Sequence, residues 1–155
     1  MTLRGSFTYV DSELAEDLPA DVVAGGTPGK KGDRSPFVPK VTASASVEYE
    51  HPVSEDVSVY GLGSANYRGA SFSAFRPVTA ADIAAGADDN YYSKLPSYVL
   101  LDLRAGFRTG RYDINVFVDN VTNEVTYSGL NANIDATRVY SARPRTVGVG
   151  MSARF

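Results

Sequence analysis

The last eleven residues of the chain alternate between apolar side chains and polar or small ones, and this alternation limits the fold more than any other feature. Successive side chains of a β-strand point to opposite faces, so residues two apart share a face. One face carries Val147, Val149, Met151, Ala153 and Phe155, and the other carries Thr146, Gly148, Gly150, Ser152 and Arg154. An apolar and a polar face on one strand, with an aromatic residue at its end, are typical of transmembrane β-strands.

Five further segments alternate in the same way, namely residues 3–9, 41–50, 57–68, 98–108 and 113–119. Two residues break the alternation, because Leu62 and Leu100 are apolar but fall on the polar side of their segments. A tilted strand of about 10 residues is long enough to cross a bilayer. We therefore predict an all-β chain with about six antiparallel transmembrane strands.

The connections between these segments are alternately long and short. They cover residues 11–37, 51–56, 69–96, 109–111 and 120–143. Outer-membrane barrels join their strands by short periplasmic turns and long extracellular loops, so the final strand should end on the periplasmic side. The first loop is rich in Gly and acidic residues and should be mobile. In the second loop, Thr79 should cap a short helix that Gly86 ends.

Composition excludes several classes of protein. The chain has 155 residues, a net charge of −3 and no cysteine, which indicates neither a nucleic-acid partner nor a disulfide framework. A mean hydropathy of −0.17 and the lack of any run of 18 apolar residues exclude a helical membrane protein. No export signal precedes the first strand, so we expect such a signal upstream of Met1.

We predict no enzyme activity and no cofactor. His51 is the only histidine and falls in an expected turn, where a structural surface role is the simpler interpretation. Asp88, Asp89 and Asn90 lack the spacing of a calcium loop. The glycosylation sequon at 120–122 is better interpreted as a cap at the exit of a strand, because Asn and Thr side chains bond to nearby backbone.

Three glycines lie within the predicted strands, at positions 61, 63 and 106. Glycine inside a strand often marks a bend or a place where another segment packs closely. We expect one of these two roles at each position.

Four segments resemble the last strands of a TonB-dependent outer-membrane receptor. They are Pro36–Ser44, Tyr98–Phe107, Val116–Glu124 and Pro144–Val149, the last followed by the terminal Phe155. The most specific parts are the strand exit at 119–123 and the entry at 144–146 to a final strand ending in Phe. The resemblance covers almost the whole chain from Leu3.

This resemblance implies active import of a ferric siderophore, cobalamin, haem or oligosaccharide through a barrel of about 22 strands that an N-terminal plug closes. Residues 1–155 would be the C-terminal part of that barrel in a bacterial outer membrane, without the plug, the energy-coupling box or the earlier strands. The implied partners are membrane lipid, the missing strands and plug, the TonB system and the barrel-insertion machinery. Six strands cannot close such a barrel, so the chain should need the missing ones.

Two groups of residues are the candidate functional residues under this interpretation. The polar residues expected to line the lumen are Glu48, Asn66, Arg68, Asp102, Arg104, Asp113 and Asn115. The residues expected to form the barrel-assembly signal are Val147, Val149, Met151, Ala153 and Phe155. The alternative is a soluble β-sandwich with a binding or structural role, since its strands also alternate, with the apolar face turned inward. The sequence does not identify the ligand.

Overall fold

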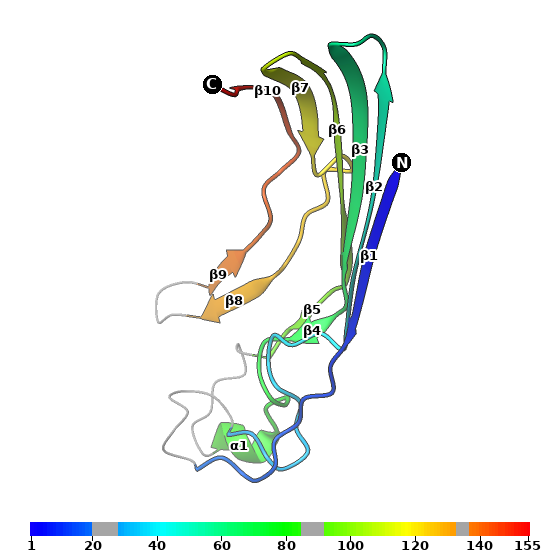
Figure 1. Ribbon diagram of the computed structural model, residues 1–155. Coiled ribbons are helices and arrows are strands. Elements are labelled where there is room, and N and C mark those ends of the chain that lie inside the picture. Colours follow the sequence, from blue (N-terminus) through cyan, green and yellow to red (C-terminus); the bar gives the residue numbers. More distant parts are fainter. Residues whose placement is uncertain (20–27, 85–91, 133–136) are drawn as a thin grey trace.

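A computed structural model describes residues 1–19, 28–84, 92–132 and 137–155 of the chain, and its main feature is one six-stranded antiparallel sheet (Figure 1). The strand order is β1-β2-β3-β6-β7-β10, so each strand of the sheet pairs with the sheet strands next to it in sequence. The strands are β1 (Thr2–Tyr9), β2 (Val41–Pro52), β3 (Val57–Arg68), β6 (Tyr98–Thr109), β7 (Tyr112–Asp119) and β10 (Thr146–Ala153). The short turns lie at one end of the sheet and the long connections at the other.

The prediction of six antiparallel strands is confirmed, but three boundaries were wrong, one of them at the last strand, where β10 ends at Ala153 rather than at Phe155. His51 and Pro52 belong to β2 rather than to a turn, because β2 stays paired with β3 as far as Pro52 and Ser58. Thr109 belongs to β6 and pairs with Tyr112, which leaves a turn of two residues in which Gly110 has a φ of 52°. That left-handed conformation is accessible to glycine and matches the twist of the strands.

The two faces of the sheet differ in chemistry, as the register shows. One row across five strands, on what we call the apolar face, is Val47, Gly63, Leu103, Val118 and Val147. The next row, on what we call the polar face, is Glu48, Leu62, Arg104, Phe117 and Gly148. Sequence alternation therefore produces two separate surfaces that each extend across the sheet.

The apolar face is open. Val149 is 75% exposed and Met151 67% exposed, and within the described ranges the only buried hydrophobic residues are Tyr60 and Leu95. A β-sandwich would cover this face with a second sheet to form a core. In the described part of the chain, the further strands form only two-stranded ribbons within the long connections, so the described fold is not a sandwich.

The long connections contain small elements that the alternation did not predict. β4 (Ser71–Phe72) pairs with β5 (Lys94–Leu95), and β8 (Gly129–Ala132) pairs with β9 (Thr137–Tyr140). Figure 1 shows the β8–β9 ribbon set away from the sheet and the other small elements beyond its long-loop end. The helix α1 (Ala80–Ala84) lies where the sequence predicted one.

The described parts of the first long connection are tied to each other and to the second. Leu14 donates its backbone N–H to Asp33 and Ser35 donates to Ser12, at 2.9 and 3.0 Å. Gly29 is buried so closely against Leu14 and Phe75 that a Cβ there would lie 2.5 to 2.9 Å from their atoms. These parts therefore have hydrogen bonds and a closely packed glycine that the composition did not predict, while the mobility of the loop stays a prediction. Residues 20–27 lie outside the described residues.

The cap of α1 is confirmed, because the Thr79 hydroxyl oxygen accepts the backbone N–H of Asp82 at 3.3 Å. The Asp82 carboxylate accepts the backbone N–H and the hydroxyl of Thr79 at 2.8 and 2.6 Å, and Arg76 binds the same carboxylate through two nitrogens. The Arg76 hydrogen bonds, followed by those from Thr79, hold the pKa of Asp82 well below its usual range. Gly86 and the Asp88–Asn90 segment lie outside the described residues. Among the described helices none is long and apolar enough to cross a membrane.

Candidate functional site: the polar face of the sheet

A cluster of charged and aromatic side chains occupies the polar face near the short turns. The Arg108 guanidinium binds Glu50 at 2.7 Å and Asp113 at 3.2 Å, and it lies 4.3 Å from the centre of the Tyr60 ring. Asp113 also accepts the Tyr60 hydroxyl at 2.8 Å, and Glu50 accepts the Ser58 hydroxyl at 2.7 Å. These contacts join four neighbouring strands, β2, β3, β6 and β7.

The register explains why these residues meet. Arg108 pairs with Ser58 on one side and with Asp113 on the other, so its carboxylate partner on β7 is directly opposite. Neighbouring strands are about 4.8 Å apart, so an arginine side chain reaches two strands away to Glu50. Gly106 makes the ring position possible, because a Cβ there would lie 2.9 Å from the Tyr60 ring and 2.5 Å from the Ile114 carbonyl oxygen. Close packing is thus confirmed at Gly106, whereas a Cβ at Gly61 would meet nothing within 4 Å.

A second arrangement on the polar face contains Arg104. Its guanidinium lies 5.5 Å from the centre of the Phe117 ring. The ring in turn lies over Gly148, where a side chain would collide with it. Within the described residues the Arg104 side chain makes no ion pair or hydrogen bond, in contrast to those of Arg4, Arg68 and Arg108 on the same face. Arg104 therefore presents an exposed cation on an aromatic support.

The exit of β7 is held by side-chain hydrogen bonds to backbone. Asp102 accepts the N–H of Asn120 at 2.9 Å, and the Asn120 side chain bonds to backbone groups of Glu124 and Arg143. Asn120 is only 4% exposed and has a φ of 51°, which Asn tolerates better than most residues. The interpretation of the sequon at 120–122 as a strand-exit cap is confirmed. The cap fixes the start of the last long connection relative to its end.

All seven predicted lumen residues lie on strands of the large sheet, on its polar face, but they do not form one cluster. Asp113 and Asn115 are in the charged cluster, where an Asn115 side-chain N–H lies 3.5 Å from Asp113. Glu48 faces Arg4 at 3.6 Å, and Arg68 donates to the Phe37 carbonyl at 2.7 Å. Asp102 supports the β7 exit, while the side chains of Arg104 and Asn66 make no hydrogen bond within the described residues. Their role as lumen lining remains a prediction.

A hollow of about 440 Å³ lies on the polar face among these groups. Its lining combines Leu62 and Phe117 with charged residues of both signs, including Arg104, Glu48 and Asp113. Leu62, which broke the sequence alternation, thus lies in a recess where an apolar side chain has polar neighbours. Charged and hydrogen-bonding residues outnumber apolar ones in this lining, so the hollow is a mainly polar recess.

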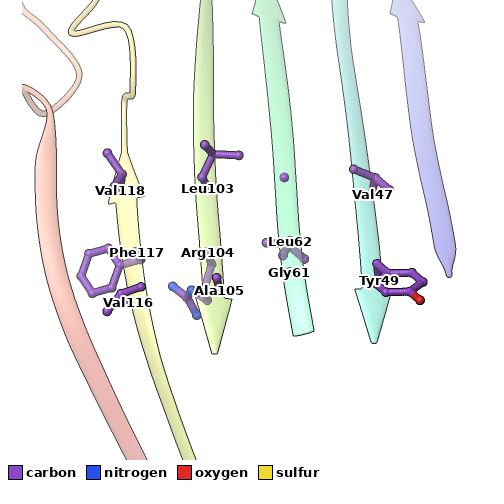
Figure 2. A pocket seen from close by; sticks show the side chains of 11 residues that line it. Val47, Tyr49, Gly61, Leu62, Leu103, Arg104, Ala105, Val116, Phe117 and Val118 are labelled. Atoms are coloured by element: carbon purple, nitrogen blue, oxygen red, sulfur yellow. The ribbon is translucent and has the colours of Figure 1, made fainter. Parts of the chain in front are cut away.

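The apolar face has a hollow as well. Figure 2 shows the residues that line it, which come from β2, β3, β6 and β7. The apolar-face positions among them are Val47, Tyr49, Leu103, Ala105, Val116 and Val118, whereas Leu62, Arg104 and Phe117 belong to the polar face of the same strands. Its volume is about 480 Å³, and the space above β3 is open at Gly61, whereas Leu103 and Val47 lie close to Gly63. Its surface is almost wholly apolar, so it offers neither a charge nor a hydrogen bond to a polar ligand.

Sequence reasoning did not single out Glu50, Tyr60, Arg108 or Phe117, although all four contribute to the polar face. The contacts of these four residues depend on the register between strands, and the alternation along a single strand does not give that register. The one sequence signal that could have identified them is their position on the polar side of each alternating segment. Within the described ranges, no group of three or more His, Cys, Asp or Glu side chains is placed to hold a metal ion.

Comparison with known protein families gives one match. The family model described as TonB dependent receptor-like, beta-barrel matches residues 1–123. The match includes β1 to β7 and the cap at Asn120, and therefore most of the polar face described above. Comparisons with curated proteins and with solved structures find no significant match.

Proposed function

Because this chain belongs to the TonB-dependent receptor β-barrel family, we propose that it forms the C-terminal wall of an outer-membrane barrel that imports a scarce ligand by TonB-dependent transport. Membership of this family supports the general assignment of the chain to an outer-membrane transporter or receptor. The proposal rests mainly on the difference between the two faces of the sheet. The apolar face is exposed, and the polar side chains of neighbouring strands contact one another on the other face. A bilayer favours the first surface, and an aqueous lumen favours the second.

The edges of the sheet support a larger assembly. β1 and β10 are the outer strands of the sheet, so each has one edge without a neighbouring strand in the described part of the chain. An unpaired backbone group in hydrocarbon costs several kcal/mol, and only barrel closure satisfies all of them. In the proposed receptor, earlier strands pair with both edges and a plug fills the lumen. The seven polar residues predicted from the sequence then face the plug and the ligand path.

Cysteine labelling tests the location and the topology, since the chain has no cysteine of its own. In the full-length receptor, Lys31→Cys in the first long connection should react with a membrane-impermeant maleimide on intact cells. Glu55→Cys in the short turn is the matched control and should react only after the outer membrane is opened. Both residues are exposed, so accessibility to solvent does not distinguish them. Equal labelling of the two positions on intact cells would refute the proposed topology.

Transport is tested in cells with and without TonB. Uptake of a ferric tris-catecholate, haem, cobalamin and a neutral hexasaccharide is measured in cells that produce the receptor. The proposal expects uptake of at least one of them that disappears without TonB. Uptake that is the same in both strains would contradict energy coupling through TonB.

A further inference from the structure

The polar face is chemically different at its two ends. The half near the short turns holds the Arg108 cluster and the exposed Arg104. The half near the long connections consists largely of neutral side chains that donate and accept hydrogen bonds. These are Ser6, Thr8, Thr42, Ser44, Ser46, Ser64 and Asn66, which the register of β1, β2 and β3 places side by side.

Several of these neutral groups are available to a ligand. The Ser6 and Ser44 hydroxyls bind each other at 2.8 Å, and Ser64 lies 3.3 Å from Asp102. Among the described residues, Thr42, Ser46 and Asn66 have no side-chain hydrogen bond, and Asn66 is exposed. Hydroxyl and amide groups each offer both donors and acceptors. This part of the sheet therefore presents hydrogen-bonding capacity that no residue of the described chain uses.

The charges in this half balance. They are Arg4 and Arg68 against Asp102 and Asp119, and Glu48 in the adjoining row is the partner of Arg4, so positive charges do not outnumber negative ones. Arg4 faces Glu48, Arg68 donates to the Phe37 carbonyl, and Asp102 accepts the Asn120 N–H. This half of the polar face therefore has no surplus of positive charge to hold an anionic metal chelate, unlike the half that carries Arg104.

An apolar surface lies directly beside the neutral groups. Leu100 pairs with Asn66 across β3 and β6, and Tyr98 pairs with Arg68 in the row nearer the long connections. Leu100 is the second residue that broke the sequence alternation, and its place beside Asn66 gives a ligand apolar contact next to amide and hydroxyl groups. A sugar ring has matching chemistry, because its C–H face is apolar and its edge carries hydroxyls.

We propose that the outer half of the polar face, with Asn66, Ser46, Thr42 and Leu100, is a contact surface for a neutral oligosaccharide. This inference rests on the proposed function and adds the class of ligand. The last long connection carries Arg143 and Arg145, which would favour an anionic ligand instead. An anionic chelate is therefore the competing outcome of the test.

The test measures binding to the purified full-length receptor by calorimetry. The probes are a panel of neutral hexasaccharides with α- and β-linkages and a ferric tris-catecholate as the anionic chelate. We expect binding of at least one hexasaccharide, and a loss of affinity of at least about tenfold in Asn66→Leu, where a bulky apolar group replaces the amide. Ala65→Leu is the matched control, because residue 65 is the neighbour on the apolar face, and its affinity should be unchanged.

Asn66→Ala provides a second variant in case the leucine variant folds poorly, and it should also weaken binding. If none of the hexasaccharides binds, or if Asn66→Ala and Asn66→Leu bind as the parent does, the inference is overturned. If the receptor binds only the ferric chelate and imports it with TonB, the inference fails while the proposed function stands. If the cysteine labelling places the receptor outside the outer membrane, the proposed function is refuted, and the inference that rests on it is refuted with it.

Discussion

The carboxylate of Asp102 accepts the backbone N–H of Asn120 at 2.9 Å, which ties the end of β7 to the middle of the neighbouring strand β6. The Asn120 side chain in turn forms hydrogen bonds with the backbone of Glu124, near the start of the last long connection, and of Arg143, near its end. A buried amide with every bond satisfied fixes local geometry more strongly than an exposed one. The pair therefore helps to fix where the chain leaves β7 toward the β8–β9 ribbon.

Replacing Asn120 with alanine should therefore destabilise the sheet. The change removes three hydrogen bonds and places alanine at a φ of 51°, so we expect a loss of about 2 to 4 kcal/mol in the free energy of unfolding. Urea unfolding in lipid vesicles measures it. Asn120→Gly is the control, since glycine accepts the φ but lacks the bonds, and the difference between the two variants gives the backbone contribution. A loss below 1 kcal/mol, roughly one hydrogen bond, would show that the cap is dispensable.

Two glycines in neighbouring strands should respond oppositely to alanine. At Gly106 a Cβ would lie 2.5 Å from the Ile114 carbonyl oxygen, which the backbone cannot easily move, so Gly106→Ala should cost about 1 to 3 kcal/mol. At Gly61 the space is open, and Gly61→Ala should be neutral or stabilising by about 0.5 to 1 kcal/mol. The same unfolding assay compares them, and similar costs at both positions would contradict the packing around Tyr60.

Order around α1 should be insensitive to pH in the physiological range. The pKa of Asp82 is lowered in the folded state by Arg76 and Thr79, so its stabilising contribution is complete above its unfolded pKa of about 3.9 and is lost as the pH falls toward the lower folded value. Hydrogen-exchange protection of the Ile83 amide, which donates to Thr79, should be the same at pH 7 and 5 and fall only in stronger acid. Asp82→Asn should abolish the fall. A loss of protection between pH 7 and 5 would place the controlling group elsewhere.

The two faces of β10 should tolerate charge differently in a bilayer. Val149 is on the apolar face, so Val149→Arg in the full receptor should cost about 2 to 4 kcal/mol if it lies near the midplane. Ser152 is on the polar face opposite Asp113, and Ser152→Arg should cost far less. Folding into synthetic lipid measures both variants. Equal penalties would show that the assignment of the faces to lipid and lumen is incorrect.

Deletion of Phe155 should separate assembly from stability. The strand β10 ends at Ala153, and Phe155 is fully exposed beyond it with its ring 6.0 Å from the Arg111 guanidinium. The ring thus adds little to the described fold, and we propose that it acts with Val147, Val149, Met151 and Ala153 as a signal for the insertion machinery. The deletion should slow insertion by purified machinery and leave spontaneous folding into lipid unchanged. Equal slowing of both processes would support a simple anchoring role at the interface.

The sequence alone determined the number of sheet strands, their antiparallel order and the identity of the two faces. These features depend on a period of two along each strand and on the lengths of the connections, and both are local properties. Alternation fixed the side of the sheet for Asp113 and Val149 without any knowledge of their neighbours. It located the ends of β2 and β6 less well, because cross-strand pairing continued through Pro52 and Thr109.

Only the tertiary structure decided which residues of the polar face meet. Arg108 binds Glu50, which is 58 residues earlier in the chain, because two strand pairings bring β2, β3 and β6 into one register. The contacts between the first and second long connections, such as Gly29 with Phe75, likewise join segments that no short-range pattern relates. Alternation specifies the face on which a side chain lies, whereas its partners depend on registers set by the whole sheet.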